Sequence, residues 1–494
     1  SKMYRVIKNM YSTTKSSIKI NNKITNWFEV TRGVRQGDSL SPTLFNIFIN
    51  DLPQIFKQDD CDPLKIEQTN IGSLLFADDI LIMSETKEGL QSSLNHLSQY
   101  CDKWQLTVNC KKTKTMILST SNNRKNLNHS FNYNGDKLEQ MEKFKFLGNI
   151  ISQNGNLIHS AQELAKKSMK VMYSIKTYCN SIHQTPVNLS NHLFNSLVRP
   201  ILTYNSEIWY MDAYSSFYKA SIKGDKNNKK VDTLNFIDKS PPDKVLNKFN
   251  KLTLGVKKCS CNIAARSELG SYPIDCFIKR QTLLFHDRLL REETSPLLKE
   301  TLNLAKTLHN AGIYSWYSYV NHVRSQNDLE IVNQNKDKNN RLIYKQNLEN
   351  SYENLYNDKI LNLQENSKLQ LFKKIKKSYN FEPYLLSQNF EYRQLISKFR
   401  ISDHCLLIET GRYRKIPRDL RLCTHCDVLD DEFHFFFKCK INEQLRKEFL
   451  NENKYNNLND IDKLKHILNP ETKQDTCKLG SFLKKSLRLR AGSP

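Results

Sequence analysis

Along the first 155 residues, segments with the spacing of hydrophobic residues typical of strands are followed by segments with the spacing typical of helices. This pattern predicts a region of mixed helices and strands. Short strands are expected near Ser17–Ile20 and Trp27–Thr31, on either side of a turn at 21–23. Residues 71–83 are an apolar run of strand length, interrupted only by a pair of acids. The predicted fold class is α+β.

Helical spacing of apolar residues predicts two helices in the same region. The first runs from about Pro42 to Phe56, with Ser41 placed to cap it and Pro42 in its first turn. The second covers 86–105. The residues expected to face inward are Leu44, Phe48, Leu52 and Ile55 in the first helix, and Leu90, Leu94, Leu97 and Trp104 in the second.

The rest of the chain divides by composition. Residues 156–220 and 246–400 have the pattern of helices, and 221–245 are polar, contain Gly224, Pro241 and Pro242, and are expected to be a linker. Residues 401–445 combine a basic segment with a cluster of cysteine and histidine. A tail at 446–494 follows, and its basic end near Lys484–Arg490 is expected to be solvated.

Charge narrows the choice of partners. Among 494 residues, 75 are lysine or arginine and 51 are acidic, a net charge of +24 that favours a polyanion such as nucleic acid. An inert basic surface is the alternative.

Apolar residues do not form a run long enough to span a membrane. Twelve cysteines scattered along the chain suit reduced thiols, and we expect a nuclear and cytoplasmic protein.

The two acids within the apolar run, Asp78 and Asp79, carry the strongest chemical signal. Burying two unpaired carboxylates would cost several kcal/mol or more, so they must be exposed at a hairpin turn or neutralised by a cation. Oxygen ligands suit Mg²⁺, which also binds substrate phosphates. Two such ions activate an attacking hydroxyl and stabilise a leaving pyrophosphate. An ordinary Asp-Asp turn between core strands is the alternative.

A glycine-containing segment at 33–42 precedes the first predicted helix. Gly37 permits close approach of a ligand to the backbone, Arg35 can contact a phosphate, and Gln36 can hydrogen-bond a template base or sugar. The same residues would also suit a plain loop leading into a well-capped helix.

These segments, taken in order, resemble the motifs of reverse transcriptases. Residues 33–42 resemble motif B, and Phe76-Ala77-Asp78-Asp79 resembles the catalytic motif C. Residues 104–114 are similar to motif D, in which Lys112 and Lys114 are the candidates to act near the departing pyrophosphate. Residues 144–151 resemble motif E, which grips the primer. The order and separation are similar to those of LINE-type (non-LTR) retrotransposons of the jockey kind.

The resemblance implies a partial palm at 1–155 and thumb-like helices at 156–220. It implies an RNA-directed DNA polymerase that uses an RNA template, a DNA primer or target, deoxynucleotides and Mg²⁺. Phe76 and Ala77 would then lie beside the template or substrate. Protein partners are not indicated. A non-catalytic nucleic-acid-binding remnant and a domesticated protein are the alternative interpretations.

One departure from the family pattern concerns the metal site. The family needs a further aspartate, in motif A, and Glu29 is the only acid in residues 1–32. We therefore expect a C-terminal fragment that lacks motif A, the fingers and the endonuclease, and that does not polymerise DNA by itself. A misplacement of about 1 Å already costs about a hundredfold in rate.

Near the C-terminus, Cys423, Cys426, His434 and Cys439 have the spacing of a zinc knuckle. A Cys-x2-Cys pair forms a tight turn, and the later His and Cys complete a tetrahedron around Zn²⁺. Unrelated buried cysteines are the alternative. The cluster also resembles the zinc knuckle that follows the polymerase in LINE-type proteins.

The basic segment at 410–421 comes just before this cluster. Arg412 and Arg414 supply positive charge, and Tyr413 between them can stack on a base, as single-stranded nucleic acid binding requires. A solvated basic loop is the alternative.

Overall fold

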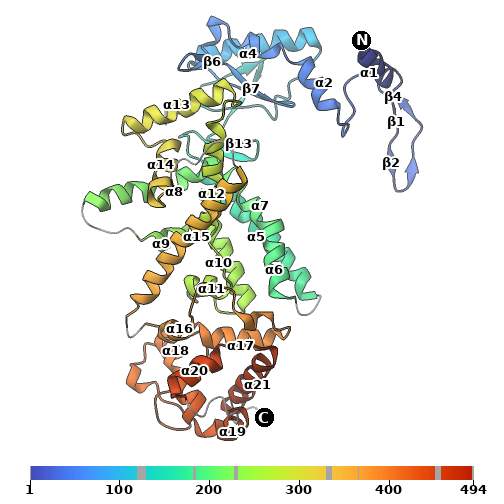
Figure 1. The fold of residues 1–494 in the computed structure, drawn as a ribbon. Helices are drawn as coiled ribbons and strands as arrows, with labels where there is room; N and C mark the ends of the chain where they lie inside the picture. The colour runs from blue at the N-terminus through green and yellow to red at the C-terminus, as the bar shows by residue number, and fades with distance from the viewer. Residues whose placement is uncertain are drawn as a thin grey trace. The chain divides into compact units, whose positions relative to one another are not determined.

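The computed structural model describes residues 2–119, 129–181, 185–226, 232–329, 337–364, 367–450 and 458–491. The chain forms two compact units, one of Ser1–Ile117 with Ser121–Glu142 and one of Leu118–Thr120 with Lys143–Pro494 (Figure 1). The expected palm region 1–155 is therefore not one unit, because its last hairpin belongs to the second. None of the described helices is long and apolar enough to cross a membrane.

The first unit opens with helix α1 (Lys2–Ser12) and two small antiparallel pairs, β1 (Lys15–Ser16) with β4 (Phe28–Glu29) and β2 (Lys19–Ile20) with β3 (Lys23–Ile24). Asn21 and Asn22 connect β2 to β3 with φ angles of 44° and 66°. Two left-handed residues in a row are what a tight two-residue hairpin turn requires. The predicted turn at 21–23 is thus confirmed.

The predicted helix from Pro42 to Phe56 is two helices, α2 (Ser41–Phe48) and α3 (Leu52–Ile55). The expected cap at Ser41 is wrong, because Ser41 already lies in the helix and its hydroxyl donates a hydrogen bond to the Arg35 carbonyl at 2.6 Å. Leu52 is buried, whereas Phe48 is 40% exposed.

Helix α4 (Lys87–Trp104) packs into the hydrophobic core of the first unit. Thr86 caps it by accepting a hydrogen bond from the Gly89 amide, and Leu94 and Leu97 are buried as predicted. Trp104 is 37% exposed and does not face the core as expected. The other strands here are β5 (Leu64–Ile66), β6 (Thr69–Ile71), β7 (Ser73–Phe76), β8 (Asp79–Ile82), β9 (Lys114–Thr115), β10 (Asn132–Tyr133), β11 (Asp136–Lys137) and β12 (Glu139–Gln140), paired two by two.

The second unit begins with the hairpin of β13 (Lys143–Phe146) and β14 (Asn149–Ser152). Its backbone is attached to helices of the same unit. The Tyr204 hydroxyl donates to the Leu147 carbonyl at 3.0 Å, and the Ile150 amide donates to the Ser160 hydroxyl at 2.7 Å. The helices that follow are α5 (Ile158–Ser181), α6 (Val187–Leu193), the π-helical turn η3 (Phe194–Val198), α7 (Arg199–Leu202) and α8 (Ser206–Lys226).

The expected linker at 221–245 is wrong in its described part. The end of α8, helix α9 (Thr233–Lys239) and the start of α10 (Pro241–Leu254) occupy it. The two prolines begin α10, where proline is well tolerated, and Ser240 caps that helix. Ile237 and Val245 are buried in hydrophobic cores, so this stretch is part of the packed unit.

Long helices make up the middle of the second unit, as predicted for 246–400. They are α11 (Asn262–Glu268), α12 (Ile274–Leu289), α13 (Pro296–Asn310), α14 (Trp316–Gln326) and α15 (Asp337–Leu361). Helix α12 packs along α15 and also contacts α8, α10 and α14 (Figure 1).

The C-terminal region is a helical cluster around its own apolar core. Its elements are α16 (Gln370–Ile375), η4 (Pro383–Leu386), α17 (Phe390–Arg400), α18 (Leu407–Tyr413), η5 (Arg418–Leu420), η6 (His434–Lys438), η7 (Lys440–Asn442), α19 (Glu443–Phe449), α20 (Asp460–Leu468) and α21 (Lys473–Arg490). Leu479 and Leu483 of α21 are buried against α17. The end near Lys484–Arg490, which was expected to be solvated, is solvated only in part, because Lys485 and Arg488 are exposed whereas Ser486 is buried.

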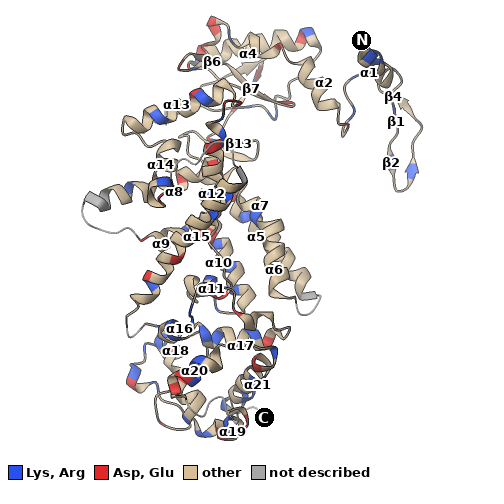
Figure 2. Ribbon diagram, in the orientation of Figure 1, with Lys and Arg blue, Asp and Glu red and all other residues tan. Residues whose placement is uncertain are grey.

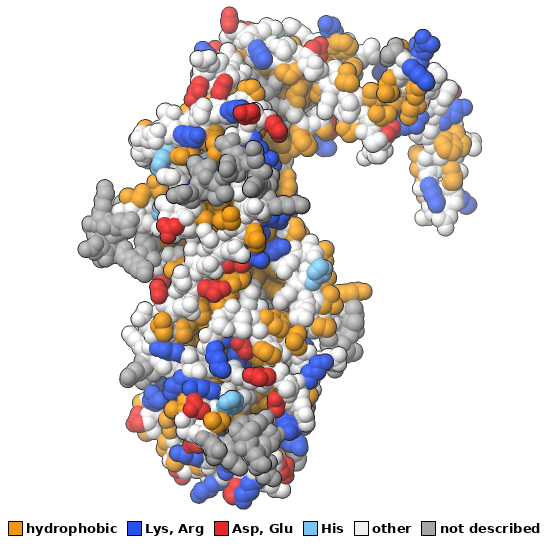
Figure 3. Space-filling view, viewed as in Figure 1, with side chains coloured by type: hydrophobic (Ala, Val, Ile, Leu, Met, Phe, Trp, Pro, Cys, Tyr) orange, Lys and Arg blue, Asp and Glu red, His pale blue; other side chains and the backbone are white. Residues whose placement is uncertain are grey.

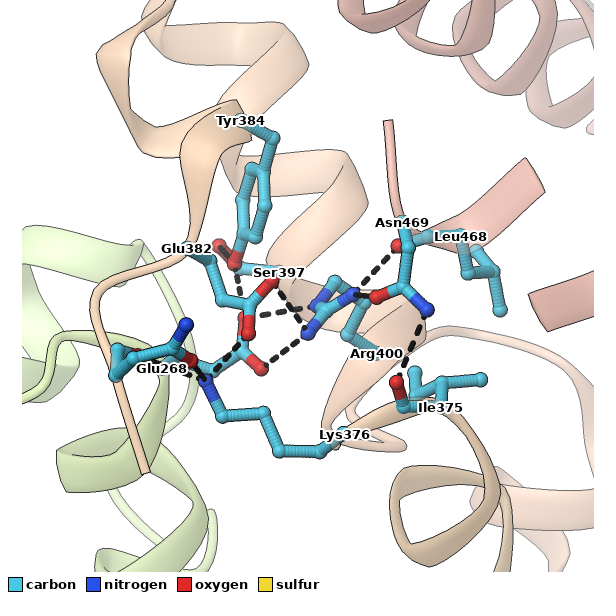
Figure 4. A network of polar contacts seen from close by, with 10 residues as sticks. Glu268, Ile375, Lys376, Glu382, Tyr384, Ser397, Arg400, Leu468 and Asn469 are labelled. Carbon is cyan, nitrogen blue, oxygen red and sulfur yellow. Dashed lines mark hydrogen bonds and ion pairs between the residues drawn. The ribbon is translucent and has the colours of Figure 1, made fainter. Parts of the chain in front are cut away.

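A buried polar network joins α16, η4, α17 and α20 of this cluster to α11 of the middle region (Figure 4). Arg400 of α17 donates to both oxygens of Glu268 at 2.8 and 2.9 Å, and lies 3.1 Å from a carboxylate oxygen of Glu382. Lys376 pairs with Glu382, and Arg400 also donates to the Leu468 carbonyl at 2.6 Å. Arg400 and Glu268 are completely buried. Each side chain therefore neutralises the charge of the other, which water cannot reach.

Candidate carboxylate hairpin and metal centre

Asp78 and Asp79 lie at the tip of the β7–β8 hairpin, as the sequence predicts. The register pairs Phe76 with Asp79, so Ala77 and Asp78 form a two-residue turn in which Ala77 has a φ angle of 52°. Both carboxylates are exposed. Because the turn is exposed, the two carboxylates remain in contact with water and do not need a buried counterion. They are also accessible to a cation.

The two faces of the hairpin differ. Leu75 and Ile82 pack against the core of the first unit. On the opposite face Leu74 is 41% exposed and Phe76 is 62% exposed, and among the described residues the sheet consists of these two strands. Asp79 is paired with Phe76 and so lies on this uncovered face. A two-stranded hairpin has marginal stability by itself, so a neighbouring strand would both support it and extend the site.

The carboxylate pair does not form a complete metal site among the described residues. The sets of three or more His, Cys, Asp and Glu side chains that could share an ion do not include Asp78 or Asp79. Mg²⁺ binds proteins through few carboxylates and keeps several waters or substrate oxygens. The hairpin can supply two carboxylate ligands to such an ion.

The glycine-containing segment has the backbone that its glycines predict. Gly33 and Gly37 have φ angles of 79° and 85°, and a Cβ at either position would meet open space. Gln36 is exposed. Arg35 donates to the Met10 carbonyl at 2.6 Å and lies over the Tyr11 ring, so its guanidinium is held on α1.

The two candidate lysines differ in their contacts. Lys114 forms an ion pair with Glu139 at 2.5 Å across the parallel β9–β12 pair. Lys112 is exposed at the end of a turn that its amide closes by donating to the Asn109 carbonyl. Of the two, Lys112 is the one whose ammonium faces solvent.

The four predicted zinc ligands come together in the second unit. The ligand atoms of Cys423, Cys426, His434 and Cys439 all lie within 4.8 Å of one another. The turn that begins at Cys423 is closed by the Cys426 and Asp427 amides, which donate to the Cys423 carbonyl at 3.2 and 3.0 Å. Cys423 and Cys439 are completely buried, and His434 is nearly so.

The state of His434 tests whether the cluster fits a metal. Both ring nitrogens are buried and have no hydrogen-bond partner among the described residues. Leaving a buried polar atom without a partner costs about 1–3 kcal/mol, so such atoms are rare in a folded protein. The Asp431 carboxylate accepts from the His434 amide at 2.8 Å and fixes the backbone. A zinc ion bound to one nitrogen would satisfy it, and the chemistry of the donor set fits Zn²⁺.

Burial sets the protonation of these groups in the absence of an ion. Burial, reinforced by the neighbouring Cys423, raises the pKa of Cys439 to about 11. Burial also lowers the pKa of His434. A dication reverses the thiol shift, because thiolate is the form that binds zinc.

Arg490, at the end of α21, closes over the cluster and was not predicted to do so. It donates to the Cys423 sulfur at 3.4 Å and pairs with Asp430 at 2.5 Å. The Lys440 amide donates to the Cys426 sulfur at 3.4 Å. Phe435 and Phe436, next to His434 in sequence, are buried in the hydrophobic core of the same unit. Hydrogen bonds to sulfur stabilise thiolate ligands in a metal site.

The basic segment before the cluster is partly helical. Arg412 pairs with Glu409 at 3.3 Å along α18, whereas Arg414 is exposed. Tyr413 is 55% exposed and its hydroxyl accepts from Lys368 at 3.1 Å. The ammonium groups of Lys368 and Lys257 lie 5.6 and 5.9 Å from its ring. These two lysines are far away in sequence, so the local pattern could not reveal them.

Comparison with known proteins adds an independent finding. The family model described as "Reverse transcriptase (RNA-dependent DNA polymerase)" matches residues 1–151. A Pol polyprotein from the type-1 retrotransposable element R2 of Nasonia vitripennis is 29% identical over 30% of this chain and 15% of its own length. The probable RNA-directed DNA polymerase from transposon BS of Drosophila melanogaster is 23% identical over 44% of this chain and 24% of its own length.

A third relative is the RNA-directed DNA polymerase from mobile element jockey of Drosophila melanogaster. It is 19% identical over 46% of this chain and 25% of its own length. The chain thus spans a quarter or less of these three relatives.

Proposed function

We propose, from the premise that residues 1–151 are a reverse transcriptase domain related to those of non-LTR retrotransposons, that this chain is part of an RNA-directed DNA polymerase. The observation that carries the proposal is the exposed carboxylate pair at the tip of the β7–β8 hairpin, within the matched residues. Its substrates would be an RNA template, a DNA primer and deoxynucleotides, and it would act in the nucleus and the cytoplasm.

Asp78 and Asp79 would hold Mg²⁺ against the phosphates of the incoming nucleotide. The ion would supply charge stabilisation at the phosphate and activate the primer hydroxyl. Lys112, which faces solvent, would lie near the departing pyrophosphate, while Gln36 and Gly37 would border the template. Phe76 and Ala77 would flank the same substrate from the hairpin.

The carboxylate set would be completed by a further acid on polypeptide that covers the open face of the hairpin. Apolar exposure supports this, because α1 has no buried residue and hydrophobic side chains of the first unit lie uncovered (Figure 3). The exposed set in this part is Met3, Tyr4, Val6, Met10, Ile18, Ile20, Ile24, Trp27, Phe28 and Val34. Large apolar patches on soluble proteins mark contact surfaces.

Primer extension tests the proposal. The chain supplied with polypeptide that carries the further acid should extend a DNA primer on an RNA template with Mg²⁺ and deoxynucleotides. Asp79→Asn should abolish extension, whereas Asp136→Asn, an exposed acid on another hairpin, should leave it unchanged. Undiminished extension by Asp79→Asn would refute the assignment.

The 494-residue chain by itself should not extend the primer, because two carboxylates from one side hold the metal poorly. Addition in trans of polypeptide that carries the further acid is expected to restore extension. Robust extension by the chain alone would refute the incomplete set.

The second part of the proposal is that Cys423, Cys426, His434 and Cys439 bind one structural Zn²⁺. The orphaned nitrogens of His434 support it. Metal analysis of the purified chain should give one zinc, and Cys426→Ser should lose it. Cys477→Ser, an exposed cysteine on α21, is the matched control. Equal zinc in the wild type and Cys426→Ser would remove the assignment.

A nucleic-acid-binding protein without polymerase activity is the second candidate. The exposed Tyr413 between Lys257 and Lys368 favours it, because an aromatic ring beside cations suits a stacked base near its phosphate. Arg412 and Arg414 would add charge at the same place. RNA binding that persists while extension remains absent, even when polypeptide carrying the further acid is supplied, would support this candidate over the polymerase.

A further inference from the structure

A cavity of about 400 Å³ lies among helices of the second unit, away from the zinc ligands. Arg199 of α7, Phe277 and Arg280 of α12, and Lys345 and Glu349 of α15 contribute to its lining. Figure 2 shows Lys and Arg positions on all three helices. The cavity therefore has several cations and one acid among its walls.

The arginines crowd around one aromatic ring. The guanidinium carbons of Arg199 and Arg280 lie 4.6 and 4.8 Å from the centroid of the Phe277 ring. Each of these positions favours a planar cation, because the ring face is electron-rich. Arg341 of α15 is a third cation close by, and after burial its charge is the largest cause that lowers the pKa of both Arg199 and Arg280.

Within the described residues, the two arginines at the Phe277 ring lack the direct ion pairs that arginines form elsewhere in the same unit, although the charge of Glu349 opposes the lowering of the Arg280 pKa. Arg266 pairs with Asp238 at 2.7 Å, and Arg400 pairs with Glu268. In the part of the chain that the structure describes, Arg199 and Arg280 make no ion pair, and the buried Nε of Arg280 has no hydrogen-bond partner. The nearby acid, Glu349, lies 4.0 Å from Lys345. Like charges held together in this way favour a bound anion.

We propose that Arg199 and Arg280 bind the backbone phosphates of a single nucleic-acid strand. A guanidinium offers paired donors that match two oxygens of a phosphate, which a lysine does not. The Phe277 ring keeps two of the guanidinium planes in place, and the binding is indifferent to base sequence. The site belongs to the second unit, whereas the carboxylate hairpin belongs to the first, and the proposed binding does not depend on polymerase activity.

Binding of a labelled single-stranded RNA of mixed sequence to the whole chain tests this proposal. Arg199→Gln and Arg280→Gln should each weaken binding about tenfold, the usual loss for a charge-assisted hydrogen bond. The plot of log affinity against log salt should become shallower by about 0.7 for each phosphate that the variant no longer neutralises.

Arg288→Gln is the matched control. Arg288 is on the same helix and lies 4.8 Å from the Phe285 ring, but it is exposed and outside the cluster. Its substitution should leave both affinity and salt dependence unchanged. Equal losses from Arg288→Gln and Arg280→Gln would overturn the proposal.

Thermal unfolding separates a binding role from a structural one. Without RNA, Arg280→Gln should unfold no lower than the wild type, because it removes repulsion between like charges. With RNA, the wild type should gain more stability than the variant, since a ligand stabilises the state that binds it. A variant that unfolds at a lower temperature and binds RNA normally would overturn the proposal.

Competition distinguishes a strand from a small anion. Unlabelled RNA and unlabelled single-stranded DNA should both displace the probe, at far lower phosphate concentration than inorganic pyrophosphate. Displacement by pyrophosphate at an equal phosphate concentration would overturn the assignment to a strand. Primer extension is not part of this measurement, so the polymerase proposal can fail without affecting it.

Discussion

The carboxylate hairpin and the Cys/His cluster are both short local motifs, but their surroundings differ. Asp78 and Asp79 lie on a two-stranded sheet with one open face. Cys423 and Cys439 are completely buried, and Arg490 donates a hydrogen bond to the Cys423 sulfur. A closed ligand set within the described residues can bind an ion by itself, whereas an open pair needs partners. The comparison teaches that a motif identifies ligands, and its surroundings decide whether they are sufficient.

Zinc removal should give the largest effect and sharpen the comparison most. Structural zinc contributes on the order of 10 kcal/mol of folding free energy in small domains. Chelation, or Cys439→Ser, should therefore unfold the C-terminal helices at a markedly lower temperature. Calorimetry with zinc analysis measures this. If chelation leaves the unfolding temperature unchanged, the buried cluster does not depend on metal.

Arg400→Met should give the next largest effect, a loss of about 3–5 kcal/mol, because Glu268 would be left charged and buried. The control is Lys484→Met, which breaks a partly exposed pair with Glu391 and should cost less than about 1 kcal/mol. Urea unfolding of both variants measures the difference. Equal losses would show that the network of Figure 4 has no special role.

A buried acid predicts a pH effect that the exposed hairpin should lack. Burial raises the pKa of Asp243 to about 7. Between about pH 4 and pH 7 the folded state therefore keeps a proton on Asp243 that the unfolded state has already released. The free energy of unfolding should thus fall as pH rises toward 7. Asp243→Asn should flatten this slope in urea unfolding.

Asp79→Asn is the matched comparison for the pH effect, because its carboxylate is exposed. Its curve should follow that of the wild type. Parallel curves for Asp243→Asn and the wild type would refute the buried proton.

Ala77→Gly should have the smallest effect. Ala77 has a φ angle of 52°, a conformation that costs an L-residue roughly 1 kcal/mol and a glycine little. The variant should therefore be as stable as the wild type or slightly more so, by less than about 1 kcal/mol. A clear loss in urea unfolding would mean that the turn observed here is not the one adopted in solution.

Sequence patterns predicted features that depend on near neighbours. The turn at 21–23, the hairpin that carries Asp78 and Asp79, and the helix capped by Thr86 follow from residues within a few positions of each other. Sequence patterns gave wrong predictions where contacts between residues far apart in sequence decide the local structure. The stretch at 221–245 has the composition of a linker, but its apolar residues Ile237 and Val245 find partners in two separate cores.

The sequence by itself determined the resemblance to reverse transcriptase motifs, the four candidate zinc ligands and the basic character of the chain, because each depends on residue type and spacing. Tertiary structure alone decided that Arg490 contacts the Cys/His cluster, that Lys257 and Lys368 flank Tyr413, and that Arg199 and Arg280 share the Phe277 ring. Those contacts join residues far apart in sequence, and local periodicity carries no information about which distant helices pack together.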